Sequence, residues 1–199
     1  MQLPVLEPCQ HVLQAAEFGT KSQLLLEIGQ NDDPIAVMLG CSELGFAPDE
    51  VSHANPGEIM IVQNPAGLVP PADTGGTIAS IMYGLHLPTV RHLIVCGHTQ
   101  CGILRMVLAK ESKGKESPVL MGLQGVMKRF HAIYADRPEH DWLGIIIQET
   151  ILQQLAHFRS DTYVQSRLQQ GKLFLHGWIR DDQTSSITSY EPVSGQFCD

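Results

Sequence analysis

A chain of 199 residues with 43% hydrophobic and 17% charged residues is long enough to bury a core without disulfides or a structural metal. The formal net charge is −8 and the 13 Lys and Arg residues are scattered, which excludes nucleic acid and an anionic membrane as the main partner. No stretch approaches the ~18 consecutive apolar residues of a membrane span, so we expect no membrane insertion.

The amino terminus and the cysteines predict a cytoplasmic location. Residues 1–8 contain neither the basic region nor the uninterrupted apolar run of a secretory signal. The five cysteines are an odd number, and without an export signal this favours reduced thiols over a disulfide framework. In such a setting, cysteines that lie close to histidines indicate a metal site or a catalytic site.

Strand and helix patterns alternate along the sequence. Residues 9–28 have a moderate helical pattern, and we assign residues 1–30 to an amino-terminal helical arm. Short apolar runs typical of buried parallel strands lie at 35–40, 58–62, 92–96 and 172–178. Helical patterns cover residues 74–87, 102–110, 118–134, 141–158 and 161–170. The sequence therefore predicts a single α/β domain over residues 1–199, with a mainly parallel central sheet flanked by helices.

Cysteine and histidine side chains follow two of the predicted strands. Cys41 comes directly after one strand, and His98 and Cys101 follow the strand that ends at Cys96. Such sheets bind ligands beyond the carboxyl ends of their strands, and residues three apart at the start of a helix share one face. Two thiolates and one imidazole are a ligand set typical of zinc, with a fourth position left open for catalysis.

Other interpretations of these side chains remain open on spacing alone. Buried cysteines are commonly small apolar side chains, and His98 could simply cap a helix. A lone catalytic thiol paired with His98 is a further alternative. No cysteine has a second cysteine three residues on, which excludes a dithiol redox pair of that spacing.

A series of motifs between residues 35 and 192 resembles the β-class carbonic anhydrase family. Residues 41–45 are similar to its Cys-x-Asp-Ser-Arg motif and residues 96–102 to its Cys-Gly-His-x-x-Cys-Gly motif. Its Pro-Gly-Glu, Arg-Asn-x-Ala-Asn and Gly-x-Leu-x-x-His-Gly-Trp patterns are similar to residues 56–58, 63–67 and 171–178. The resemblance implies that family's fold, a homodimer or larger homo-oligomer, and reversible hydration of carbon dioxide to bicarbonate. It also implies one Zn²⁺ per chain, with Cys41, His98 and Cys101 as ligands.

The sequence departs from the family at residues with functional roles. Glu43 and Gly45 replace an Asp and an Arg that pair in the family, where the pairing keeps the Asp off zinc. Gly45 has no guanidinium, so we expect nothing local to restrain Glu43 in that way. A positive φ at Gly45 would also resist a larger side chain. Gln63 and Gly67 replace the family's Arg and final Asn in the second stretch.

Three functions are consistent with these departures. In the first, the protein hydrates carbon dioxide weakly or in an altered way, and Glu43 is a catalytic residue that accepts a hydrogen bond from the attacking hydroxide. In the second, Glu43 closes the zinc site and the protein is a catalytically silent homologue with a structural or binding role. In the third, the substrate is a related linear molecule such as a sulfur analogue of carbon dioxide. A solvated Glu43 is the remaining possibility.

Two further groups of polar residues are expected to be structural. His176 lies on an apolar strand and is predicted to be a core histidine rather than a ligand. Asp181 and Asp182 follow that strand and are expected to cap or solvate a loop.

Overall fold

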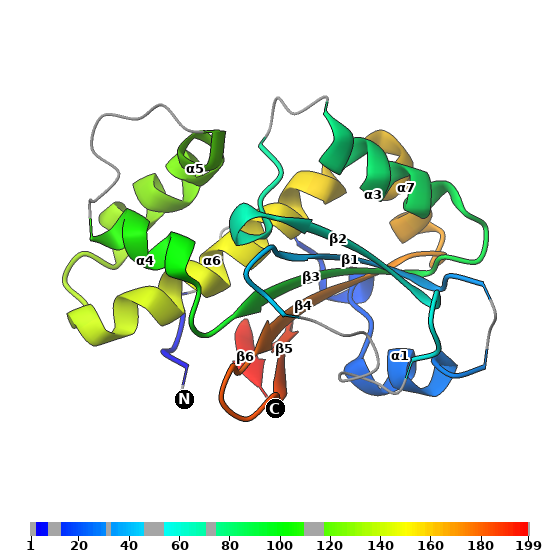
Figure 1. The fold of residues 1–199 in the computed structure, drawn as a ribbon, viewed down its shortest axis with the longest axis horizontal. Coiled ribbons are helices and arrows are strands. Elements are labelled where there is room, and N and C mark those ends of the chain that lie inside the picture. The colour runs from blue at the N-terminus through cyan, green and yellow to red at the C-terminus, as the bar shows by residue number, and fades with distance from the viewer. Residues whose placement is uncertain are drawn as a thin grey trace.

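A computed structural model describes residues 3–7, 13–30, 33–45, 54–70, 75–109 and 118–198. Within these residues the chain forms a six-stranded sheet in the order β2-β1-β3-β4-β5-β6 (Figure 1). The parallel strands are β1 (Ala36–Cys41), β2 (Ile59–Asn64), β3 (His92–His98) and β4 (Phe174–Arg180). The antiparallel strands β5 (Ile187–Glu191) and β6 (Gln196–Cys198) extend one edge. The predicted α/β fold with a mainly parallel sheet is confirmed.

The helices of the described chain cover the sheet and connect its strands. They are α1 (Lys21–Glu27), α3 (Gly76–His86), α4 (Gly102–Leu108), α5 (Pro118–Ile133), α6 (Glu139–Arg159) and α7 (Thr162–Gln169), with short 3-10 turns η1 (Ala15–Glu17) and η2 (Pro65–Gly67). Helix α3 packs on β1 and β2, and α6 packs on β3 and β4. In Figure 1, α3, α6 and α7 lie along one side of the strands and α1 lies on the other.

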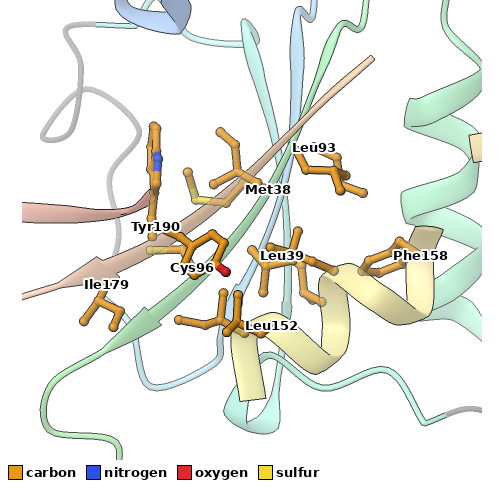
Figure 2. Close-up of a cluster of buried hydrophobic side chains, with 14 of the residues drawn as sticks. Met38, Leu39, Leu93, Cys96, Leu152, Phe158, Ile179 and Tyr190 are labelled. Atoms are coloured by element: carbon orange, nitrogen blue, oxygen red, sulfur yellow. The ribbon is translucent and has the colours of Figure 1, made fainter. Parts of the chain in front are cut away.

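The core lies between the central strands and α6. All six residues of β1 are buried, as expected for a parallel strand that is covered on both faces. Leu39 and Leu93 point from β1 and β3 toward Leu152 and Phe158 of α6 (Figure 2). This packing fixes the two strands whose carboxyl ends carry the cysteine and histidine side chains.

The amino-terminal pattern differs from the predicted continuous helix over 9–28. Residues 8–12 lie outside the described part, and the rest forms η1 and α1 separated by an extended segment at Phe18 to Thr20. Phe18 forms a parallel bridge with Leu175 of β4. A side chain on Gly19 would approach the His176 ring to 2.7 Å, so a glycine is needed where the chain crosses β4. Sheet pairing at this point overrides the helical pattern.

The antiparallel β5–β6 hairpin was not predicted from the sequence. Ile187 to Glu191 contains several polar residues and only two large apolar ones, so its pattern is weak. Its pairing with β4 over Trp178 to Arg180 stabilises it, and β6 pairs with its other side and forms the edge of the sheet. No helix of the described residues is long and apolar enough to cross a membrane.

Candidate metal centre

Four potential metal-binding side chains meet at the carboxyl ends of β1 and β3, close to the start of α4. Cys41 ends β1, His98 ends β3, and Cys101 directly precedes α4, while Glu43 lies in the turn after β1. One ligand atom from each of the four lies within 4.8 Å of the others. The sequence therefore identified residues that the fold brings together, although they come from separate segments.

The donor atoms of this cluster fit a metal ion. The Sγ atoms of Cys41 and Cys101 are 3.9 Å apart. His98 Nε2 is buried and has no hydrogen-bond partner among the described residues, a costly state for a polar atom that a metal ion would relieve. Two sulfur atoms, an imidazole nitrogen and a carboxylate are all ligands that zinc accepts in four-coordinate sites.

Proximity shifts the ionisation of the two cysteines in opposite directions. The hydrogen bond with Cys101, with help from His98 and the Glu43 N–H, lowers the pKa of Cys41 to about 4 despite its burial. The same Cys41 sulfur and burial raise the pKa of Cys101. Burial acts to lower the pKa of His98, but Cys41 and Asp182 outweigh it and raise that pKa. The two sulfur atoms and His98 thus influence one another's protonation, as expected of groups that share one site.

Cys96 lies near these residues in sequence but outside the donor cluster. Its side chain is buried in β3, and burial raises the pKa of this thiol to about 12. Its Sγ is 3.5 Å from the carbonyl oxygen of Gly97. Cys96 is therefore a neutral core side chain, which makes it a matched control for the cysteines of the cluster.

A backbone N–H from another segment restrains Glu43, a contact that differs in kind from the arginine pairing that Gly45 excludes. The N–H of Gly102 donates to Glu43 Oε2 at 2.7 Å. The same oxygen is 3.9 Å from His98 Nε2. A Cβ atom on Gly102 would lie 3.0 Å from Glu43 Oε1, so the glycine leaves room for this contact. The first N–H of α4 thus holds this carboxylate, although position 45 is a glycine instead of an arginine.

Gly45 has a different backbone conformation from the one expected, and Gln63 contacts the turn that carries Glu43. Gly45 does not have a positive φ, and a Cβ atom there would meet nothing within 4 Å among the described residues, so the expected backbone obstacle to a larger residue is wrong. Gln63 Nε2 donates to the carbonyl oxygen of Leu44 at 2.8 Å and lies 3.4 Å from that of Cys41. Gln63 therefore stabilises the turn that carries Glu43.

A small, mostly apolar cavity adjoins the donor atoms. Cys41, His98 and Cys101 contribute to its wall. The other lining residues are Ala66, Gly67, Val95, Cys96, Gly97, Leu104, Ile147, Thr150 and Ile151. This wall places few hydrogen-bonding groups beside the candidate metal position.

The sequence analysis expected His176, Asp181 and Asp182 to be structural, and this holds for the first two but not for Asp182. His176 is buried and its Nε2 lies 2.9 Å from His92 Nδ1, so the prediction of a core histidine is confirmed. Asp181 accepts the N–H groups of Gln183 and Thr184 in a turn, as expected of a loop aspartate. Asp182 instead contacts the candidate ligand His98 at 2.8 Å, which the sequence analysis missed.

Comparison with known proteins assigns the chain to a family. The carbonic anhydrase family model matches residues 36–187. A carbonic anhydrase of Synechococcus elongatus is 26% identical over 183 residues, covering 89% of this chain and 67% of that protein. One from Pseudomonas aeruginosa is 26% identical over 188 residues, covering 90% of this chain and 84% of that protein. The solved β-carbonic anhydrase CcaA superposes with a TM-score of 0.77 at 25% identity and covers 89% of each chain. The chain therefore belongs to the carbonic anhydrase family, in its β class.

Proposed function

We propose that this protein catalyses the zinc-dependent, reversible hydration of carbon dioxide to bicarbonate, with Cys41, His98 and Cys101 as the zinc ligands. The observation that supports the proposal is the buried His98 Nε2, which lacks a hydrogen-bond partner in the described chain and faces two cysteine sulfurs. The two thiolates would balance the charge of one Zn²⁺ ion. Membership of the carbonic anhydrase family is consistent with this chemistry.

The residues around the site have separate roles in this proposal. Bound zinc would lower the pKa of a water molecule and so supply the nucleophile near neutral pH. Glu43 lies at the solvent side of the site, with its side chain 42% exposed, and accepts the hydrogen bond that orients the nucleophile. Gly102 holds Glu43 in this place. The apolar wall, which includes Val95 and Ile147, receives carbon dioxide.

A pair of cysteine variants tests the ligand set. Cys101→Ser should lose most of its zinc and its hydration activity, because a serine hydroxyl is a poor zinc ligand at neutral pH. Cys96→Ser, the same substitution at a buried cysteine outside the cluster, should keep about one zinc per chain. Zinc content and stopped-flow hydration are measured on the same samples. Retention of zinc by both Cys101→Ser and a Cys41→Ser variant would contradict the ligand set.

One observation favours a second function, that of a catalytically silent zinc-binding homologue. A carboxylate oxygen of Glu43 is itself among the four donor atoms within 4.8 Å, so this side chain is close enough to fill the fourth position on zinc. In that case zinc-loaded wild type would be inactive. The double variant Glu43→Asp with Gly45→Arg would then gain activity, since the guanidinium would draw the shorter carboxylate away. The backbone at Gly45 accepts a larger residue, because its φ is not positive.

We also propose that the protein forms a homodimer or a larger homo-oligomer. Strand β2 lies at one edge of the sheet and pairs only with β1 among the described strands. Its residues Met60, Ile61 and Val62 are only partly buried. An unpaired edge with apolar side chains is a surface that proteins commonly cover by association.

A further inference from the structure

A carboxylate from the neighbouring strand contacts the rear of the His98 ring. Asp182 follows β4, whose last residue, Arg180, lies opposite His98 in the register of β3 and β4. Asp182 Oδ2 accepts a hydrogen bond from His98 Nδ1 at 2.8 Å. The same oxygen accepts the backbone N–H of Gln100 at 2.8 Å. The carboxylate thus bridges His98 and the start of the turn that leads to Cys101.

Several contacts keep the Asp182 carboxylate in this position. The backbone N–H of Asp182 donates to Thr99 Oγ1 at 3.1 Å, and that of Thr99 donates to the carbonyl oxygen of Arg180 at 3.0 Å. Arg180 Nη1 lies 3.4 Å from Asp182 Oδ1. The side chains of Asp182 and His98 are 22% and 5% exposed, so water competes little for their hydrogen bond.

The contact determines which nitrogen of His98 is free to bind a ligand. An ionised carboxylate only accepts hydrogen bonds, so the proton of the neutral ring lies on Nδ1 and the lone pair on Nε2. Nε2 is the atom that faces Cys41, Glu43 and Cys101 without a hydrogen bond in the described chain. We infer that Asp182 is a positioning residue, which fixes the tautomer and orientation of His98 and thereby strengthens metal binding. This inference rests on the proposed metal site.

A purely structural role is the competing explanation, since Asp182 also holds the N–H of Gln100. The substitution Asp182→Asn separates the two roles, because the amide oxygen can still accept one N–H while the negative charge is lost. Asp181→Asn is the matched control. It makes the same charge change one residue earlier, on a side chain that accepts the N–H groups of Gln183 and Thr184.

The test is competition for Zn²⁺ between a chromophoric chelator and the full-length wild type, Asp182→Asn and Asp181→Asn. We expect Asp182→Asn to bind zinc about 10- to 100-fold more weakly, the usual effect of removing a carboxylate partner from a histidine ligand. Asp181→Asn should stay within about twofold of wild type. The unfolding midpoints of the zinc-free proteins should remain similar. Equal zinc affinity of Asp182→Asn and wild type, or an equal loss in both variants, would overturn the inference.

A second measurement applies to the wild type and does not depend on the folding of a variant. Nitrogen-15 NMR of the zinc-free protein at an alkaline pH, where the ring is neutral, should show His98 with a proton on Nδ1 and none on Nε2, because bound zinc would itself impose this tautomer. A His98 ring protonated on Nε2 would overturn the role of Asp182. Failure of the wild type to bind zinc at all would instead overturn the proposed metal site and this inference with it. Normal binding by the wild type and by Asp182→Asn would overturn the role of Asp182 alone.

Discussion

Glu43 Oε2 lies 2.7 Å from the backbone nitrogen of Gly102, so the first N–H of α4 holds this carboxylate beside the candidate metal site. The hydrogen bond joins the turn after β1 to the helix that follows Cys101. It restrains the Glu43 carboxylate without an arginine at position 45.

Removing the Gly102 N–H should therefore lower hydration activity. Gly102→Pro deletes this donor at the first position of a helix, where proline is tolerated, and Cys101 already has a compatible ψ of 108°. A hydrogen bond to a charged group contributes about 1.5–3 kcal/mol, so we expect kcat to fall about 10- to 100-fold at unchanged zinc content. Gly76→Pro, at the first position of α3, is the control. Equal rates for Gly102→Pro and wild type would show that this restraint is unimportant.

Neutralising Glu43 should slow the reaction. Glu43→Gln keeps the size of the side chain, but the amide is much weaker than a carboxylate at orienting the nucleophile and at accepting a proton. A positioned acid or base commonly contributes about a hundredfold or more, so kcat should fall by about this factor in the zinc-loaded variant. The measurement is stopped-flow hydration across pH 7 to 9. A rise in kcat would support the silent homologue, because the amide would then have released a closed site.

The topology of a parallel sheet explains which parts of this site could be predicted from the sequence. The carboxyl ends of β1 and β3 are neighbours, so Cys41, His98 and Cys101 could be grouped from strand patterns alone. The Gly102 contact could not, because it depends on a backbone N–H rather than on a side chain. Asp181 and Asp182 are adjacent and chemically identical. Only the register of β3 with β4 shows which one reaches His98.

The amino-terminal segment shows a different limit of sequence analysis. Its apolar residues predict one helix, but the close approach of Gly19 to His176 and the bridge between Phe18 and Leu175 replace part of that helix with extended chain. These are contacts between residues more than 150 positions apart in the sequence. Local periodicity contains no information about them, and tertiary packing determines the outcome.

The buried pair of His92 and His176 should make stability fall in acid. Burial lowers the pKa of His92, and burial together with His92 lowers that of His176 to about 3. As pH falls below the ordinary histidine pKa, the unfolded chain binds more protons than the native one, so stability is lost. Each histidine contributes up to about 1.4 kcal/mol per pH unit.

Urea unfolding of zinc-free protein between pH 7 and 4 measures this effect. His176→Gln should have a shallower dependence of the free energy of unfolding on pH than wild type, because glutamine does not titrate. The control is His140→Gln, which changes a histidine with an 81% exposed side chain and should retain the wild-type slope. Identical slopes for wild type and His176→Gln would contradict the assignment.

An interface at the β2 edge that extends over the exposed side of α3 predicts an effect of Tyr83. Helix α3 packs on β1 and β2, and Tyr83 of this helix is 65% exposed, so its replacement leaves the fold of a single chain intact. Tyr83→Glu should weaken self-association, because a carboxylate would be buried without a partner. Val193→Glu, at an 84% exposed position next to β5, is the control. Sedimentation that shows only the 21.9 kDa monomer for wild type at micromolar concentration would refute association itself.

The most direct test of the central claim is the rate of carbon dioxide hydration by zinc-saturated wild type, measured by stopped flow near pH 8. Because Gly102 holds Glu43 by a hydrogen bond beside the three proposed ligands, the account predicts a rate well above the buffer background. Catalysis should be proportional to bound zinc. A folded sample with one zinc per chain and no activity above background would contradict the account and would favour closure of the site by Glu43.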